Sequence, residues 1–171
     1  MSQIRILAVA AGRGGTGKST LAFAVADTLR RLGVASDVAL VDLDPQAGLT
    51  GYAKRAPAAD PLHDPPVDVH GLTFFRGGRA LAHASDTEIA RHLDRALDDR
   101  EDRVVVVDLS PALTDAAHRV VFQRDDVMLL GAIKTEPGSF QSLNELVAYV
   151  SRRGLSYVLV PTIHRAVLLN N

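Results

Sequence analysis

Hydrophobic residues form two kinds of pattern that alternate along the chain. Six short runs are continuously apolar, which is typical of strands that are covered on both faces of a parallel sheet. These runs predict strands at residues 4–10, 38–41, 72–75, 104–107, 127–130 and 157–160. Between several of them, apolar residues recur at the three- and four-residue spacing of a helix instead.

This helical spacing predicts helices at residues 18–32, 87–97 and 139–150. The first should end at Gly33, because glycine is favoured just past a helix C-terminus. The second should have Asp86 as its N-cap. Strands that alternate with helices predict an α/β fold with a doubly wound, mostly parallel sheet and helices on both faces. The length of 171 residues fits one domain that spans the whole chain.

Two segments lack either pattern. Residues 56–69 contain four prolines, which predict a surface loop without regular structure. The last residues follow directly after the final predicted strand, where a two-faced sheet usually continues into a covering helix. We therefore expect either a natural chain that extends beyond Asn171 or a disordered tail.

The amino-acid composition indicates the class of protein and its cellular compartment. The shares of hydrophobic and charged residues, 47% and 23%, are those of an ordinary globular protein. The sequence shows no apolar run of membrane-spanning length and no secretory leader. The lack of cysteine excludes disulfides and thiolate metal sites. We expect a cytoplasmic protein, with association to the nucleoid left open.

The net charge and the spacing of the histidines argue against two functions, namely nucleic-acid binding by the chain as a whole and metal binding by histidines. The net charge is −1, so any contact with nucleic acid needs a local basic patch. Arg119, Arg124, Arg152 and Arg153 could form one, although such arginines more often lie on solvated helix faces. The six histidines show no metal-ligand spacing and are expected on the surface or in loops.

The strongest chemical signal follows the first predicted strand. Gly12 to Ser19 reads "GRGGTGKS", which fits the P-loop pattern G-x-x-x-x-G-K-[ST]. Glycines let backbone N–H groups curl around phosphate oxygens, and the following helix points its N-terminus at the same anion. Lys18 would neutralise phosphate charge, and the Ser19 hydroxyl would serve Mg²⁺.

Acidic residues follow two other predicted strands. Asp42 and Asp44 lie in "DLDPQ", and Asp108 ends "RVVVVD" in the Walker B arrangement. The carboxyl ends of parallel strands are where doubly wound sheets bind their ligands. One carboxylate of the first pair can orient an attacking water while the other supports Mg²⁺ or the loop, and Asp108 can hold Mg²⁺. Each aspartate taken alone could equally cap a turn.

Together these strings resemble the ParA/MinD-type ATPases, the deviant-Walker branch of P-loop proteins. The family loop K-G-G-x-G-K-[ST] corresponds to residues 13–19, its switch I D-x-D-P-Q to residues 42–46, and its Walker B strand to the run before Asp108. The likeness extends over nearly the whole chain. It is strongest to the small plasmid-partition members, in which switch I continues to "LT" and then to basic residues, here Lys54 and Arg55.

This resemblance implies a mechanism and a set of sites. Family members bind ATP with Mg²⁺ and pair as a homodimer around the nucleotides. The dimer binds DNA non-specifically. A partner protein then stimulates hydrolysis, and the dimer dissociates. By position, Lys18 contacts the phosphates, Asp44 positions the water, and Asp42 supports switch I. The nucleotide-binding residues would be Gly14, Gly15, Thr16, Gly17, Lys18, Ser19 and Thr20. The metal-binding residues would be Ser19, Asp44 and Asp108.

Arg13 departs from the family pattern, which has a lysine at this position that reaches the partner's phosphates. Arginine keeps the charge but is bulkier and planar. We hypothesise that Arg13 acts across the dimer as a catalytic arginine finger. The alternative, that Arg13 only faces solvent, stays open. Residues 161–165 lie where the family often contacts adenine.

Other functions remain open at this point. A metabolic ligase or amidase-type synthetase would share the sheet and the P-loop. A nucleotide-dependent interaction module would bind ATP without turnover. The lack of cysteine excludes the reductase branch, which holds a cluster between subunits, and no amphipathic C-terminal helix of the membrane-positioning branch is visible. The chain length and the D-x-D-P-Q string favour a partition or positioning ATPase without a membrane partner.

Overall fold

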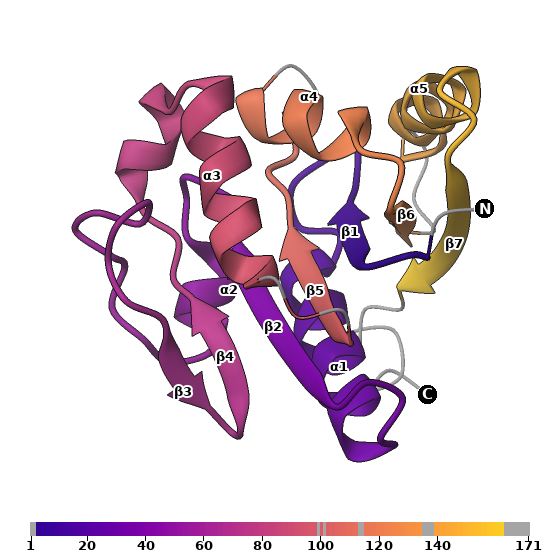
Figure 1. Ribbon diagram of the computed structural model, residues 1–171. Helices are drawn as coiled ribbons and strands as arrows, with labels where there is room; N and C mark the ends of the chain where they lie inside the picture. Colours follow the sequence, from indigo (N-terminus) through magenta and orange to yellow (C-terminus); the bar gives the residue numbers. More distant parts are fainter. Residues whose placement is uncertain (1–2, 99, 101, 113–114, 135–138, 163–171) are drawn as a thin grey trace, which may run out of the picture.

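The computed structural model describes residues 3–98, 100, 102–112, 115–134 and 139–162 (Figure 1). The strands are β1 (Ile6–Ala10), β2 (Asp37–Asp42), β3 (Val67–Val69), β4 (Leu72–Phe75), β5 (Arg103–Asp108), β6 (Val127–Lys134) and β7 (Ser156–Thr162). The helices are α1 (Lys18–Arg31), α2 (Gly48–Tyr52), the 3₁₀ turn η1 (Arg79–His83), α3 (Asp86–Leu97), α4 (Ala116–Gln123) and α5 (Ser139–Arg152).

The strands form one sheet in the order β3-β4-β2-β5-β1-β6-β7. All neighbours pair in parallel except β3, which pairs antiparallel with β4. The core lies on both faces of this sheet. Helices α3, α4 and α5 cover one face, and α1 with α2 covers the other (Figure 1). The predicted α/β fold, doubly wound and mostly parallel, is confirmed.

Each predicted strand and helix is present, with boundaries that differ by at most four residues. Runs such as 104–107 mark strands well because β5 is buried on both sides, and its valines alternate between the two cores. The structure adds β3, α2, η1 and α4, which the pattern did not predict. The prediction of an irregular segment at 56–69 is therefore wrong for its last three residues, which pair with β4 as strand β3.

The two predicted helix ends have different outcomes. Gly33 has a φ of 64°, and the N–H groups of Gly33 and Val34 bond to carbonyls of the last turn of α1, as predicted for a glycine stop. The prediction of Asp86 as N-cap is wrong. Ser85 caps α3, because its hydroxyl accepts from the N–H of Glu88 while the Glu88 carboxylate accepts from the N–H of Ser85.

The prediction for the histidines is wrong at two positions. His92 on α3 and His118 on α4 are 2% and 1% exposed. Both lie on the apolar faces of their helices, His92 beside the ring of Phe75 and His118 beside that of Phe122. Burial lowers the pKa of each to about 4, so both rings are neutral near pH 7. They are core residues, which their helical spacing could have indicated.

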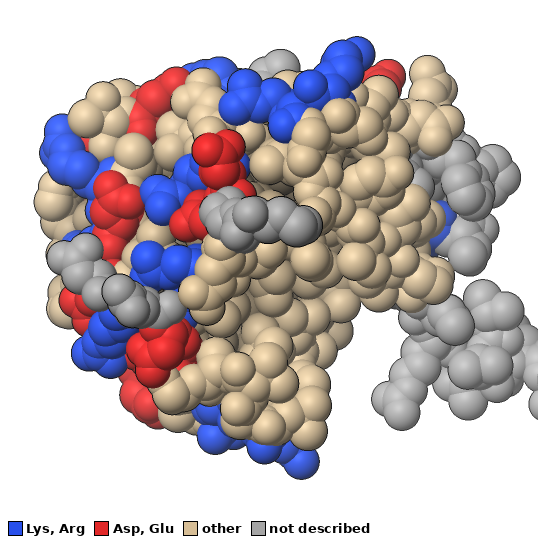
Figure 2. Space-filling model, turned by 45° about the vertical axis from the view of Figure 1, so that its right-hand side comes forward, with Lys and Arg blue, Asp and Glu red and all other residues tan. Residues whose placement is uncertain are grey.

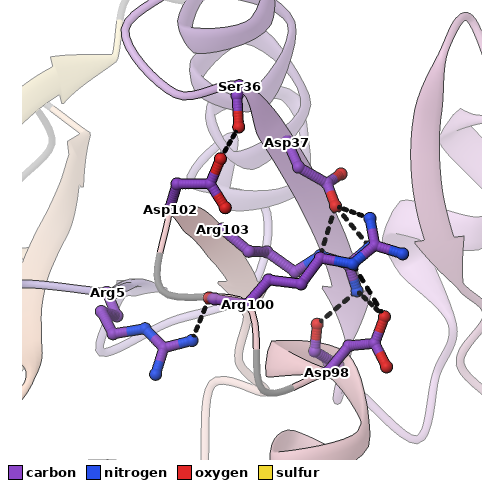
Figure 3. A network of polar contacts seen from close by, with 8 residues as sticks. Arg5, Ser36, Asp37, Asp98, Arg100, Asp102 and Arg103 are labelled. Carbon is purple, nitrogen blue, oxygen red and sulfur yellow. Dashed lines mark hydrogen bonds and ion pairs between the residues drawn. The ribbon is translucent and has the colours of Figure 1, made fainter.

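A polar network closes the amino end of the sheet (Figure 3). The Arg103 side chain is only 5% exposed and forms an ion pair with Asp37 at 2.6 Å. Arg100 bonds to the same carboxylate and to Asp98, and its carbonyl accepts from Arg5. These contacts join the first residues of β2 and β5 to the loop before β5.

Charge is distributed unevenly over the surface. On the face drawn in Figure 2, acidic and basic side chains alternate on the left, basic ones gather along the upper edge, and the centre has neither. Within the described ranges, no helix has both the length and the apolar character needed to span a membrane.

Candidate functional site

The P-loop connects the end of β1 to the start of α1. Gly15 and Gly17 have φ angles of 73° and 83°, a left-handed conformation that favours glycine. Gly17 is the N-cap of α1 and makes no side-chain cap, so the N-terminal amides of the helix stay available. Thr16 and Lys18 are buried, whereas Gly14 and Gly15 are exposed. Such a loop can wrap an anion that approaches from solvent.

Asp108 lies directly beside this loop. Its Oδ2 accepts a 2.6 Å hydrogen bond from the Ser19 hydroxyl, whereas its Oδ1 is buried and has no hydrogen-bond partner in the part of the chain that the structure describes. Burial raises the pKa of Asp108 to about 7, although Ser19 and Lys18 act in the opposite direction. A buried carboxylate oxygen without a donor is suited to a divalent cation. Asp108 and Ser19 therefore fit a magnesium site.

In contrast to Asp108, Asp42 accepts hydrogen bonds with both carboxylate oxygens, and these bonds hold the following segment in place. Oδ2 accepts from both the N–H and the hydroxyl of Thr50, at 2.8 and 2.7 Å, and Oδ1 accepts from the N–H of Asp44. The Thr50 hydroxyl in turn accepts from the N–H of Gly77. Burial raises the pKa of Asp42 to about 6. The "LT" string after switch I includes Thr50, but neither the contact of Thr50 with Asp42 nor that with Gly77 was predicted from the sequence.

Gly77 is closed to any side chain. A Cβ atom at this position would lie 2.7 to 3.0 Å from the carboxylate atoms of Asp42. The backbone of Gly77 therefore packs directly against the Asp42 carboxylate, which requires a residue without a Cβ atom.

Asp44 completes a group of three carboxylates at the carboxyl ends of β2 and β5. It is 6% exposed, and its Oδ1 accepts from the N–H of Gln46. The charges of Asp42 and Asp44 both act to raise the pKa of Asp108, whereas Lys18 acts to lower it. The sheet therefore brings Lys18, Ser19 and the three predicted aspartates together.

Thr162, at the end of β7, supports the P-loop from outside the motif. Its hydroxyl lies 2.6 Å from the carbonyl of Thr16 and 2.9 Å from that of Ile133. Of the predicted adenine-contacting segment, only Pro161 and Thr162 are described, and residues 163–165 lie outside the described residues. Thr162 lies in the segment that the resemblance placed near adenine, but its contact with the P-loop carbonyl was not predicted from the sequence.

The remaining predicted residues lie further out. Arg13 and Thr20 are exposed. Arg119 pairs with Asp86 at 2.7 Å, and Arg124 pairs with Asp94 and Asp126. The predicted basic patch is therefore divided: Arg119 and Arg124 are tied to acidic residues, whereas Arg152 and Arg153 are exposed at the end of α5.

A cavity of about 320 Å³ adjoins the site. Leu43 and Pro45 line it from the segment after β2, and Asp115 lines it from the start of α4. Asp115 also accepts a hydrogen bond from the Ser110 hydroxyl, two residues after Asp108. Its lining includes the neighbours of Asp44 in the sequence, but none of the three carboxylates of the site.

The segment that contains the P-loop and the first two aspartates matches a known family. Residues 7–74 fit the sequence profile of the CobQ/CobB/MinD/ParA nucleotide binding domain. No curated protein matches the sequence.

Solved structures with the same nucleotide-binding fold come from several proteins. A plasmid partition protein from Borrelia burgdorferi bound to AMPPNP is 20% identical, with a TM-score of 0.72 over 96% of this chain and 78% of that chain. Apo McdA from Cyanothece is 18% identical, with a TM-score of 0.73 over 93% and 72%. Cobyrinic acid a,c-diamide synthase from Mycobacterium smegmatis, with an ATP analogue and magnesium, is 24% identical, with a TM-score of 0.71 over 98% and 81%. At these identities the similarity shows the fold.

Proposed function

We propose that the protein is a dimerising ATPase that uses Mg-ATP to position or segregate DNA or another cargo in the cytoplasm. One observation carries the proposal: the buried Asp108, bonded to the P-loop Ser19, keeps one carboxylate oxygen without a donor among the described residues. Similar folds hold AMPPNP or an ATP analogue with magnesium. The D-x-D-P-Q string beside this site favours the partition class over other nucleotide-binding proteins.

Each residue of the site has a proposed role. Lys18 and the amides of residues 14–20 bind the phosphates, where the α1 N-terminus favours negative charge. Ser19, Asp108 and Asp44 hold Mg²⁺, which would neutralise phosphate charge when bound. Asp42 holds the segment 42–50 through its bonds to Thr50 and to the N–H of Asp44, and it would thereby orient Asp44 in the site.

Hydrolysis requires a positioned water. Asp44 is suited to accept a proton or orient the nucleophile, because one of its oxygens already bonds to Gln46 and the carboxylate is thereby fixed in direction. Its surroundings are acidic, and a divalent cation would relieve that repulsion. We therefore expect turnover to depend on both Mg²⁺ and Asp44.

Dimerisation would complete the site. Arg13 is exposed at the tip of the P-loop, and among the described residues no hydrogen bond or ion pair holds its side chain. It is thus available to reach the nucleotide of a second copy as an arginine finger. A stimulating partner protein and non-specific DNA are the other proposed ligands.

The test compares Asp44→Ala with wild type. The variant should still bind Mg-ATP, within about 10-fold of wild type by calorimetry because Lys18, Ser19 and Asp108 remain, yet release phosphate at least ~100-fold more slowly and accumulate as a dimer in light scattering. Asp60→Ala, which removes an exposed carboxylate from the 56–69 loop, serves as control and should behave as wild type. Normal turnover in Asp44→Ala would remove its proposed role, and absence of ATP binding by the wild type would remove the whole proposal.

A second candidate is an ATP-dependent amidase-type synthetase. The cavity of about 320 Å³ lined by Leu43 and Pro45, which flank Asp44 in the sequence, and the similarity in fold to a diamide synthase favour it. A synthetase cleaves ATP only when its organic acid is present, whereas a partition ATPase turns over with ATP alone or with DNA and its partner. Phosphate release without any organic substrate therefore separates the two candidates.

A further inference from the structure

A small cavity lies between α3 and the segment that leads from α2 to β3. Its volume is about 180 Å³, and none of its lining residues belongs to the P-loop or to the three aspartates of the candidate site. Four of the six lining residues have basic side chains, which favour an anionic ligand. We name this cavity the α3 pocket. It is lined by Leu62, His63, Glu88, Arg91, His92 and Arg95.

His92 carries a proton that no neighbouring atom accepts. The Arg95 guanidinium lies 3.2 Å from Nδ1 of His92, and Nδ1 must accept because a guanidinium can only donate. The neutral ring therefore has its proton on Nε2, which is buried and has no hydrogen-bond partner in the part of the chain that the structure describes. Burial and the charge of Arg95 lower the pKa of His92, and the Leu62 carbonyl acts in the opposite direction without completing a hydrogen bond to Nε2.

Arg95 adds a second donor of this kind. Its Nη2 donates to the carbonyl of Asp64 and to His92, each at 3.2 Å, whereas its Nε is buried without a partner among the described residues. The guanidinium carbon lies 5.3 Å from the centroid of the Phe75 ring, and His92 packs edge-on against the same ring at 5.5 Å. Phe75 therefore fixes both basic groups. Because a buried N–H without an acceptor is costly, an anion that accepts from both groups would bind favourably.

The carboxylates nearest to these donors already have partners. Glu88 accepts from both the N–H and the hydroxyl of Ser85, at 2.8 and 2.7 Å. Asp60 pairs with His63 at 2.9 Å. An anion that enters the α3 pocket would thus meet donors that are free of these carboxylates.

Two exposed side chains line the α3 pocket on its solvent side. They are those of His63, before β3, and Arg91, on α3. Exposed side chains change rotamer within nanoseconds, so both can move aside and let a small ion reach the buried donors. Arg91 can then add its charge to the bound ion. The remaining carboxylate of this segment, Asp64, pairs with Arg76 at 3.5 Å.

We propose that the α3 pocket binds a phosphate group, either as the free ion or as the end of a small phosphomonoester. A tetrahedral oxyanion can accept from His92 Nε2 and Arg95 Nε with different oxygens while another oxygen faces Arg91. A carboxylate has only two oxygens for these three donors, so phosphate is favoured. The volume is below the roughly 300 Å³ at which pockets begin to hold drug-sized ligands, which favours a small molecule. The inference does not depend on the proposed ATPase function.

The first experiment titrates inorganic phosphate into Lys18→Ala by calorimetry, without nucleotide or Mg²⁺. This background lacks the P-loop lysine, so phosphate held at the P-loop does not obscure the α3 pocket. Adding Arg91→Gln should weaken binding at least ~5-fold, because it removes one charged donor. The matched control adds Arg153→Gln, which removes an exposed charge just after α5 and should leave the affinity unchanged. Absence of saturable binding, or equal losses in both variants, would overturn the proposal.

The second experiment observes His92 itself. Nitrogen–proton correlation spectra of the imidazoles, recorded in the same background, should show His92 protonated on Nε2, and this signal should shift saturably as phosphate is added. His118 is the matched internal control, because it is likewise buried but does not line the α3 pocket, and its signals should stay in place. Binding of phosphate without a shift of His92 would place the ion elsewhere and overturn the proposal.

His92→Phe keeps a ring of similar size against Phe75 and removes the Nε2 donor. It identifies the His92 signals and should lower phosphate affinity at least ~10-fold. Unchanged affinity in this variant, when it is folded by circular dichroism, would contradict the role of His92. If the variant does not fold, Arg91→Gln and the shift of His92 decide between the outcomes.

Two further probes distinguish the sources of the ligand. Glycerol phosphate represents a small phosphomonoester, and acetate represents a carboxylate. Tighter binding of glycerol phosphate than of inorganic phosphate would assign the α3 pocket to an esterified phosphate, and equal or weaker binding would assign it to the free ion. Acetate that binds as tightly as either would contradict the choice of phosphate.

Discussion

Strands β2 and β5 run side by side and are paired at both ends, yet the two ends differ in chemistry. At the amino end, Asp37 pairs in register with Arg103, and the opposite charges form an ion pair. At the carboxyl end, Asp42 pairs in register with Asp108. Burial raises the pKa of these two carboxyls to about 6 and about 7, and the charges of Asp42 and Asp44 add to the rise for Asp108. The first end stabilises the fold. The second carries a repulsion that a bound cation would relieve, as expected of a site under functional constraint.

The largest expected effect concerns the amino end. Arg103→Ala should lower the free energy of unfolding by about 3 kcal/mol, because it removes the buried ion pair with Asp37 and the hydrogen bond to the Ala96 carbonyl, although Arg100 stays paired with Asp37. Arg100→Ala is the matched control. Its side chain is 55% exposed and should contribute less than ~1 kcal/mol. Urea unfolding at pH 7 measures both. Similar losses in the two variants would contradict the contrast between buried and exposed partners.

Next in size is an effect on the carboxyl end. Lys18→Ala should weaken Mg-ATP binding at least ~100-fold, about 2.7 kcal/mol, because it removes the cation proposed to meet the phosphates. The free energy of unfolding should change by less than ~1 kcal/mol. Calorimetric titration and urea unfolding of the same preparation give both numbers. Wild-type affinity in this variant would show that the P-loop does not bind the nucleotide as proposed.

A third prediction uses pH. Folded Asp108 keeps its proton up to about pH 7, whereas the unfolded chain loses it near 3.8, so its contribution to stability falls as pH rises through that window. Asp108→Asn removes this dependence. The variant should be about 1–3 kcal/mol more stable than wild type at pH 8 and no more stable near pH 4. Unfolding curves from pH 4 to 8 that stay parallel for the two proteins would reject the raised pKa.

The smallest effects come from two serines that each donate to an aspartate. Ser36 donates to Asp102 at the amino end, on the surface, and Ser36→Ala should cost less than ~0.5 kcal/mol of stability without a change in ATP binding. Ser19 donates to Asp108 at the carboxyl end, and Ser19→Ala should weaken Mg-ATP about 10-fold while stability barely changes. Thermal unfolding and calorimetry should separate the two variants. Matching profiles would remove the distinction between the ends.

Much of the fold could be predicted because its strands are continuous apolar runs that only a two-faced sheet can bury. The missed elements lack such patterns. Helix α4 reads "AAHRVVFQ", in which adjacent valines reduce helix propensity, and Asp115 makes no side-chain cap before it. Strand β3 has three residues and follows two prolines, so only its pairing with β4 defines it.

The residues of the candidate site likewise fall into those that a local motif predicts and those whose contacts no motif predicts. Lys18, Ser19 and Asp108 could be named because local motifs carry them. The contacts of Thr50 and Thr162 could not be predicted, although both residues lie in segments that the resemblance covers. Thr50 bridges Asp42 to Gly77, and Thr162 bonds to a loop that is 146 residues away in the sequence. Thr162 reaches the carbonyl of Thr16 only because β7 lies at the end of the sheet beside β6. Asymmetry between the ends of β2 and β5 likewise requires the strand register, which no single motif encodes.

The close approach of Gly77 to Asp42 has a consequence for genetics. If position 77 were randomised in a library and cells were selected for a working protein, glycine alone should survive, because the smallest added methyl group would press on the carboxylate that anchors α2.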